Sequence, residues 1–331
     1  MTIKNYKIAL IAINIVYSHM QSFSQQPSIP EIQTDSTILH LADPTIFHYN
    51  NTYYLYGTVE GNTSKGFLVY ASSDLRNWRL SDKNDGYALK RGEAFGRSDF
   101  WAPQVFSHQD KFYMAYVANE QIAIAESNSP AGPFRQIIKD SLSTSVKQID
   151  PFIFIDDDGK KYLYHVRLID GNRIFVAEMN DDLSSIKSET LRECIAATEG
   201  WENTAKAPWP VAEGPSVIKH KDVYYLFYTA NDFRNPDYAV GNATSKNPLG
   251  PWKKHESNPI LAKAMVGING TGHGDFFTNG KEFFYVFHTH NNNTKVGPRN
   301  TALIRAKFKK GKKNDIDEMV IDDESFYFLR K

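Results

Sequence analysis

The chain has 331 residues, with 38 Lys and Arg against 38 Asp and Glu, so its formal net charge is zero. This balance excludes a protein that holds nucleic acid through bulk positive charge, and we expect no nucleic-acid partner. The single cysteine, Cys194, can form no intrachain disulfide. The aromatic content of 13% is high and favours strands, because aromatic side chains fit a pleated, half-buried surface.

The first 24 residues predict a secretory signal. Two lysines precede an apolar run from Ile8 to Tyr17, and the small residues Ser22 and Ser24 follow it. A membrane-spanning helix needs about 20 apolar residues, so a membrane anchor is disfavoured and no span is expected. No cysteine lies near the cleavage point to carry a lipid. We therefore expect a periplasmic or secreted protein that is not a lipoprotein.

Five segments of the remaining chain repeat one pattern, in which a corner with proline or glycine leads to an apolar strand, a polar turn and an aromatic strand. The segments begin at Leu41, Phe100, Gln148, Val211 and Gly270. Each is expected to form a hairpin, because its turn carries the Asn, Asp and Gly residues that tight turns favour. The corners recur about every 50 to 65 residues, which is typical of a β-propeller.

A third apolar strand follows each hairpin, whereas fourth strands are less distinct. The last segment, from Met319 to Phe328, is expected either to complete the fifth blade or to pair with the chain start near Thr37 to His40 and close the ring. We predict an all-β protein, a five-bladed β-propeller that forms a single domain over residues 41–331. Residues 1–24 are the expected signal peptide and residues 25–40 a lead-in.

A propeller brings its corner residues together at one end of the axis. Asp43, Asp150 and Glu213 occupy corners of blades one, three and four, and Trp101 and His273 occupy those of blades two and five. Asp43 and Asp150 each precede a proline, so an extended backbone is expected at both. Repulsion among close carboxylates should keep one protonated and leave another ionised. Such an acid and base are what cleavage of a glycosidic bond requires.

The five corners resemble, in this order, those of glycoside hydrolase family 43, on the motifs Ala42-Asp43-Pro44, Trp101-Ala102-Pro103, Ile149-Asp150-Pro151, Glu213-Gly214-Pro215 and Gly272-His273-Gly274. The resemblance implies a five-bladed propeller that cleaves arabinofuranosyl or xylosyl linkages of plant cell-wall polysaccharides or oligosaccharides with inversion. It implies that Asp43 is the general base, that Glu213 is the general acid, and that Asp150 raises the pKa of the acid and orients it.

The resemblance also implies that His273 corresponds to an axial histidine that contacts a calcium ion, directly or through water. The alternative is a core histidine paired with Asp275 or a backbone carbonyl, and both interpretations stay open, because one histidine carries little metal specificity. No cofactor is expected for the chemistry itself. A calcium ion in the central channel would supply charge only.

Aromatic and planar side chains predict where a sugar binds. Trp101 and Phe47 are candidates for the wall of the innermost subsite, and Trp209 for an outer subsite. Arg299 matches an arginine that, in the resembled family, reaches the bound sugar. The expected partner is an oligo- or polysaccharide, and we expect a monomer.

Two other functions stay open. In a retaining propeller glycosidase, such as a fructan hydrolase, Asp43 would be a nucleophile and the two carboxyls would lie only about 5–5.5 Å apart. A non-catalytic carbohydrate-binding propeller is the second alternative, although a binding surface has no need to concentrate three carboxylates. The long loops at residues 87–99 and 199–210 favour a closed pocket and exo action over endo action.

Overall fold

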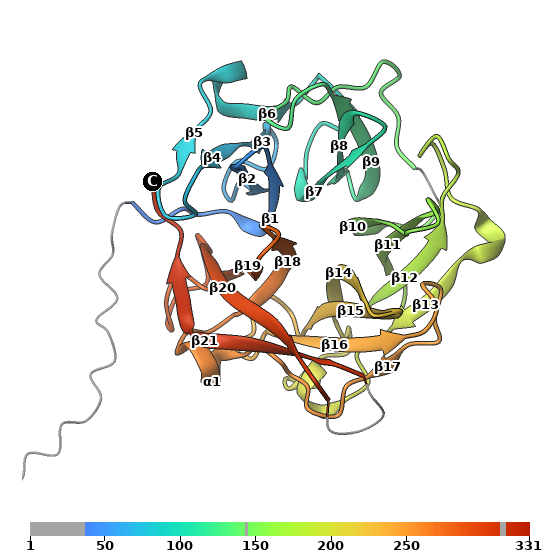
Figure 1. Cartoon of the computed structure of the whole chain (residues 1–331), viewed down its shortest axis with the longest axis vertical. Helices are drawn as coiled ribbons and strands as arrows, with labels where there is room; N and C mark the ends of the chain where they lie inside the picture. The colour runs from blue at the N-terminus through green and yellow to red at the C-terminus, as the bar shows by residue number, and fades with distance from the viewer. Residues whose placement is uncertain (1–36, 143–144, 312–315) are drawn as a thin grey trace, which may run out of the picture. The chain divides into compact units, whose positions relative to one another are not determined.

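Five sheets are arranged as blades around a central axis (Figure 1). The structure, a computed structural model, describes residues 37–142, 145–311 and 316–331. The expected signal peptide and most of the lead-in lie outside the described residues. The sheets confirm the prediction of an all-β, five-bladed propeller.

Each blade is an antiparallel sheet whose first strand lies nearest the axis. The strands of blades one to five are, in turn, β1 (Ala42–Tyr49), β2 (Thr52–Thr58), β4 (Tyr70–Ser72) and β5 (Arg79–Leu80); β7 (Trp101–His108), β8 (Lys111–Ala118) and β9 (Gln121–Ser127); β10 (Gln148–Ile155), β11 (Lys161–Leu168), β12 (Asn172–Glu178) and β13 (Arg192–Ile195); β14 (Ala212–His220), β15 (Val223–Ala230), β16 (Ala239–Ser245) and β17 (Lys253–Lys254); and β18 (Gly272–Thr278), β19 (Phe283–Thr289), β20 (Asn300–Lys309) and β21 (Glu318–Phe328). A separate pair, β3 (Gly66–Leu68) and β6 (Tyr87–Lys90), belongs to the connection between blades one and two.

Helical structure is confined to short turns in the connections of the described chain. These are η1 (Lys83–Gly86), η2 (Ser188–Thr190), η3 (Gly200–Asn203) and α1 (Lys263–Val266). Among the described residues, no helix has the length and apolar character needed to cross a membrane.

Apolar clusters fill the wedges between neighbouring blades and account for the high aromatic content. Between blades two and three, Phe106 packs in one cluster with Leu163, and between blades one and five Trp78 packs in another with Phe284. Comparable clusters occupy the three other interfaces of the described ring. An aromatic side chain buries about 150–250 Å², so aromatic residues contribute much of the apolar area in these clusters.

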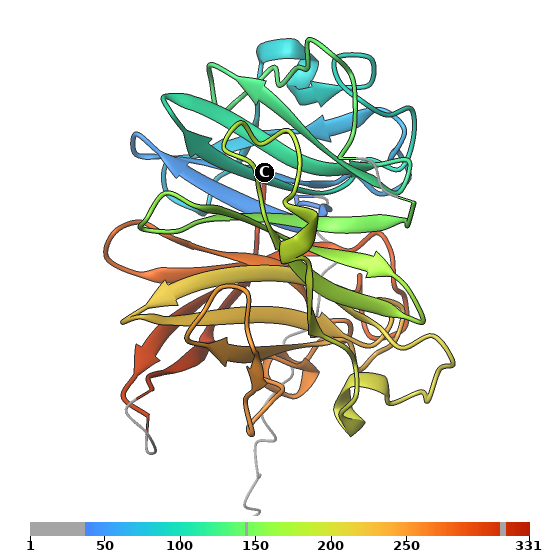
Figure 2. The same ribbon diagram turned by 90° about the vertical axis from the view of Figure 1, so that its right-hand side faces the viewer.

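The ring closes through both pairings that were left open for the last segment. Strand β21 pairs with β20 and completes the fifth blade. The Leu39 N–H also donates to the Leu329 carbonyl (2.9 Å), and the Lys331 N–H donates to the Thr37 carbonyl (2.8 Å). The view from the side shows the strands running along the axis (Figure 2). Residues at the starts of the inner strands β1, β7, β10, β14 and β18 line one cavity, so these strands all begin at one face of the ring.

Candidate active site

Every inner strand begins with a distorted corner. The pairing of β1 with β2 shifts register between Ala42 and Thr45, and the other four inner strands shift at the corresponding place. One residue at each corner has a positive φ angle, namely Asp43 (48°), Ala102 (41°), Asp150 (53°), Gly214 (59°) and His273 (44°). The expectation that proline holds Asp43 and Asp150 extended is therefore wrong. Asp enters the left-handed region more readily than most residues, because its short polar side chain can hydrogen-bond locally.

The positive φ angles also show which corner residues occupy equivalent positions in the repeat, and Glu213 is not equivalent to Asp43 and Asp150. Asp43, Asp150 and His273 share the position with positive φ, whereas Glu213 lies one residue before it. Gly214 takes that position in blade four, where a Cβ would lie 2.8 Å from the His273 ring. The other corners adopt a similar backbone angle with Asp, Ala or His, so glycine is needed in blade four for the close approach of the imidazole.

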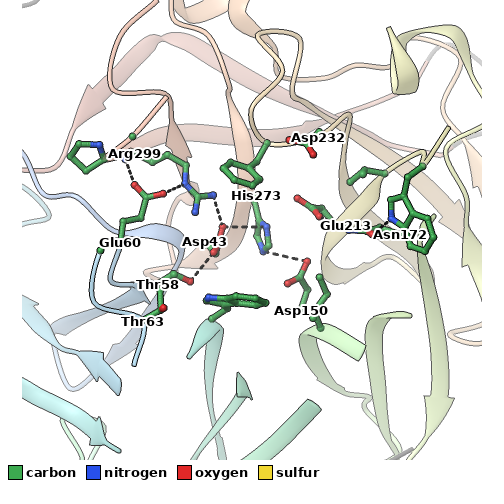
Figure 3. A pocket seen from close by; sticks show the side chains of 18 residues that line it. Asp43, Thr58, Glu60, Thr63, Asp150, Asn172, Glu213, Asp232, His273 and Arg299 are labelled. Carbon is green, nitrogen blue, oxygen red and sulfur yellow. Dashed lines mark hydrogen bonds and ion pairs between the residues drawn. The ribbon is translucent and has the colours of Figure 1, made fainter. Parts of the chain in front are cut away.

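The corners open into a cavity of about 870 Å³ at this end of the axis. Close to the axis the cavity is lined by Asp43, Asp150, Glu213 and His273, and Figure 3 shows the three carboxyl groups around the imidazole. The structure brings Trp101, Trp209 and Arg299 to the same cavity, and their contact with a sugar stays a prediction.

Phe47 lies elsewhere. Its ring packs edge-on against Phe112, with 5.8 Å between the ring centroids, and it contacts the apolar cluster between blades one and two. The prediction that Phe47 lines the innermost subsite is therefore wrong, because its side chain points from β1 into the wedge between the blades and does not line the cavity.

Asp43 is buried among positive and hydroxyl groups. Its Oδ1 lies 3.2 Å from Arg299 Nη1 and its Oδ2 accepts a hydrogen bond from Thr58 Oγ1 (2.7 Å). Burial alone would raise the pKa of Asp43, but the charges of Arg299 and of the nearby His273 imidazole hold this pKa well below its usual range. Asp43 is therefore ionised near neutral pH.

Two residues that support Asp43 were not predicted as site residues. Glu60 follows β2 and accepts hydrogen bonds from Arg299 Nε (2.5 Å) and from the Arg299 backbone N–H (2.6 Å). His288 on β19 accepts at Nδ1 from the Asp43 backbone N–H (3.1 Å). Burial and the charge of Arg299 hold the pKa of His288 well below its usual range, so its ring is neutral. The sequence signalled only that His288 and His290 share one face of a strand.

Asp150 joins the acid to the imidazole. Its Oδ2 accepts from the Gly214 N–H (3.1 Å) and lies 3.9 Å from His273 Nε2. Burial raises the pKa of Asp150, with Asp43 adding to the rise and His273 opposing it. Burial would lower the pKa of His273, but the surrounding carboxylates reverse this effect and raise it. The alternative of a pair between His273 and Asp275 does not occur.

Asp275 lies deeper in the channel. It accepts hydrogen bonds from Thr45 Oγ1 (2.8 Å) and Ser216 Oγ (2.7 Å), and burial raises its pKa to about 6. These partners leave Asp275 outside the group of carboxyls that lines the cavity.

Glu213 is buried beside a second carboxyl and accepts two hydrogen bonds. Its Oε1 accepts from Tyr238 Oη (2.7 Å) and its Oε2 accepts from Asn172 Nδ2 (2.9 Å). Burial and then the charge of Asp150 raise the pKa of Glu213 to about 7. Asp43 and Glu213 are thus two buried carboxyls in one cavity whose pKa values lie on opposite sides of the ordinary range.

The side chains around His273 do not form a metal-binding set. Its Nδ1 lies 3.4 Å from Asp43 Oδ1, and Nε2 faces Asp150. Within the part of the chain that the structure describes, no three His, Cys, Asp or Glu side chains are grouped so as to hold a metal ion. Binding of calcium here stays a prediction, which chelation followed by activity and melting measurements tests, and no step below depends on it.

Comparison with known proteins gives consistent matches. The family model described as glycosyl hydrolases family 43 matches residues 37–313. A crystal structure described as endo-1,4-β-xylanase from Bacteroides thetaiotaomicron is 42% identical, with a TM-score of 0.80, and covers 88% of this chain and 97% of its own. The β-D-galactofuranosidase xynD of Aspergillus niger is 26% identical over 293 residues, 81% of this chain and 79% of its own.

A further curated relative is the extracellular exo-α-(1→5)-L-arabinofuranosidase ArbA of Cellvibrio japonicus. It is 26% identical over 276 residues, which is 74% of this chain and 77% of its own length. The relatives thus carry different names for the sugar and for the mode of cleavage, while the match covers most of this chain in each case.

Proposed function

The chain belongs to glycosyl hydrolase family 43 and is a glycoside hydrolase, and we propose that it cleaves arabinofuranosyl or xylosyl linkages of plant cell-wall polysaccharides or oligosaccharides by a single inverting displacement. The names of the relatives, which include a xylanase and an arabinofuranosidase, support these two sugars. The observation that carries the mechanism is the opposite displacement of the pKa values of Asp43 and Glu213.

In this mechanism Asp43 is the general base. It is ionised, lines the cavity and has Arg299 on one oxygen, as a proton-accepting carboxylate needs. Asp43 takes a proton from the water as the water oxygen bonds to the anomeric carbon. An inverting site keeps its two carboxyls about 6.5–9.5 Å apart to leave room for this water.

Glu213 is the general acid. Its raised pKa keeps the proton available near neutral pH, and the proton passes to the glycosidic oxygen as the bond from the anomeric carbon to that oxygen breaks. Asp150 supports the acid in two ways, since its charge raises the pKa of Glu213 and its Oδ2 holds the next backbone N–H, that of Gly214.

Asp43→Asn and Glu213→Gln test these roles. Each should lower kcat/KM on an unactivated oligosaccharide about 10²–10⁴-fold, the usual contribution of a general acid or base. Retention of most of the wild-type rate by either variant would show that its role is assigned wrongly.

Proton NMR of the first released sugar tests the stereochemistry. Inversion is expected; release with the original configuration would instead support a retaining enzyme with Asp43 as nucleophile. The substrate panel comprises nitrophenyl α-L-arabinofuranoside, β-D-xyloside and β-D-galactoside with arabinan and xylan. Binding of these compounds without any cleavage would support the non-catalytic alternative.

We further propose that the protein is exported and works as a monomer. The apolar segment within residues 1–24 and the extracellular location in the name of ArbA support export. Fractionation of expressing cells tests export, and light scattering coupled to size-exclusion chromatography tests the monomer.

A further inference from the structure

Two hydrogen bonds connect the mouth of the cavity to the general acid. Trp209 is 47% exposed, and its indole Nε1 donates to Asn172 Oδ1 (2.9 Å). Asn172 Nδ2 then donates to Glu213 Oε2 (2.9 Å). All three side chains line the same cavity, and Figure 3 shows Asn172 beside Glu213 on the side away from Arg299.

The chemistry of the donors fixes the orientation of the Asn172 amide. An indole N–H can only donate, so the amide atom that faces it must be the oxygen. The amide nitrogen therefore faces Glu213 and donates to it. Without the indole N–H, the amide could rotate and present its oxygen to the acid, where it would no longer support a carboxylate.

The backbone holds Asn172 and Trp209 together independently of their side chains. The Asn172 N–H donates to the carbonyl of Pro210, the residue after Trp209 (2.9 Å). A Cβ on Gly171 would lie 2.6 Å from the same carbonyl oxygen, so the two segments approach as closely as a glycine permits. These backbone contacts therefore hold the Trp209 indole close to the Asn172 amide.

We propose, on the basis of the proposed function, that Asn172 is a positioning residue for the acid Glu213 and that Trp209 forms the subsite for the leaving-group sugar. The leaving group departs from beside the acid, and Trp209 lies on the acid's side of the cavity. A sugar ring stacked on the indole therefore holds the indole, the amide and the acid in one arrangement.

The contribution of Asn172 grows during the reaction. As Glu213 gives its proton to the glycosidic oxygen, negative charge develops on the carboxylate, and Asn172 Nδ2 and Tyr238 Oη each donate to one of its oxygens. A hydrogen bond to a developing charge is stronger than one to the neutral acid. Asn172 therefore favours the state in which the proton has left.

The experiment compares two substrates with the same glycone. One is an oligosaccharide of the sugar that the wild type cleaves, whose leaving group needs protonation; the other is its 2,4-dinitrophenyl glycoside, whose leaving group does not. Asn172→Ala should lower kcat on the oligosaccharide about 10–50-fold, a part of the total effect of a general acid, and kcat on the dinitrophenyl glycoside less than about threefold. The basic limb of the pH profile should move to higher pH, because the carboxylate has lost a donor.

Trp209→Phe keeps a flat ring but removes the N–H. Trp209→Phe should show the same two effects as Asn172→Ala, a selective loss of kcat on the oligosaccharide and a basic limb at higher pH, but both should be smaller. Trp209→Ala should in addition raise KM for the oligosaccharide. Asn180→Ala, which removes an amide bonded to Ser185 on the exposed side of the same blade, is the matched control and should change neither substrate. Melting temperatures of all variants report whether each is folded.

Each outcome decides the inference. Equal losses on both substrates with an unmoved basic limb would overturn the positioning role while leaving the glycosidase function intact. Wild-type kinetics retained by both Asn172→Ala and Trp209→Phe would overturn it as well. If the wild type cleaves neither substrate of any glycone, the proposed function itself fails and the inference fails with it.

Discussion

The half of the cavity around Asp43 is built from positive and imidazole partners, whereas the half around Glu213 is built from a second carboxyl and neutral donors. Arg299 contacts Asp43 directly and is itself held by Glu60. Glu213 receives bonds from a tyrosine and an amide and feels the charge of Asp150. Both acids are buried, so burial alone would raise both pKa values. The partners on each side decide which acid is ionised and which is protonated.

Among substitutions of the partners of the two acids, removing the cation from the base half should give the largest effect. In Arg299→Gln, the pKa of Asp43 rises because a buried carboxylate loses its closest positive charge. We expect kcat/KM to fall about 10²–10³-fold, with the acidic limb of its pH profile displaced to higher pH. A kinetic pH profile measures both.

Arg305→Gln is the control for loss of an arginine, since Arg305 is about half exposed on β20 and pairs with Asp322 far from the cavity. It should leave the profile unchanged. An unmoved acidic limb in Arg299→Gln would mean that the arginine contributes to sugar binding alone and that the cationic half does not set the state of Asp43.

Removing the second carboxyl from the acid half should lower the pKa of Glu213, whereas removing the cation raises that of Asp43. Asp150→Asn keeps an oxygen that can accept from the Gly214 N–H but removes the charge that raises the pKa of Glu213. The basic limb should move to lower pH, and kcat near neutral pH should fall about 10–100-fold. Asp275→Asn, a neutral replacement of a buried carboxyl deeper in the channel, should leave the basic limb in place.

The difference between the halves also separates what the sequence could predict from what it could not. The hairpins, the five blades and the corner residues Asp43, Asp150 and Glu213 follow from a pattern that recurs along the chain. The residues that bond to these acids and to Arg299 do not recur. Glu60 lies in the connection after β2, and Asn172 is the first residue of β12, the third strand of blade three. Only the closure of the ring brings Arg299 to Asp43, 256 residues earlier. The positive φ angles oppose the usual effect of a following proline and were likewise beyond local reasoning.

Tyr238→Phe should give a small change in the acid half. The hydroxyl donates to Glu213 Oε1 and lowers the pKa of the acid, so its loss should move the basic limb slightly to higher pH. We expect a reduction in kcat on an unactivated substrate of about three- to tenfold, which corresponds to the about 0.5–1.5 kcal/mol of an ordinary hydrogen bond. A shift to lower pH would contradict the assignment of Tyr238 as a donor.

The smallest expected effect is on the melting temperature. Its dependence on pH should differ between variants of the base half and of the acid half, and it needs no substrate to measure. The folded-state pKa of Glu213, about 7, lies above the ordinary value of 4.5, so the unfolded chain releases this proton first and the free energy of unfolding falls as pH rises between these values. Glu213→Gln removes the ionisable carboxyl, so the free energy of unfolding of the variant should not fall for this reason as pH rises. Its melting temperature should exceed that of the wild type by several degrees at pH 8 and by much less at pH 4.5.

Asp43→Asn should behave in the opposite way. The folded-state pKa of Asp43 is depressed, so its charge stabilises the fold above the ordinary pKa and this contribution is lost only as pH falls through the depressed value. The variant should therefore melt below the wild type at pH 8. If both variants raised the melting temperature at pH 8, the cost of burying the Asp43 charge would exceed its stabilisation by the cationic partners. The proposed difference between the two halves would then hold only for Glu213.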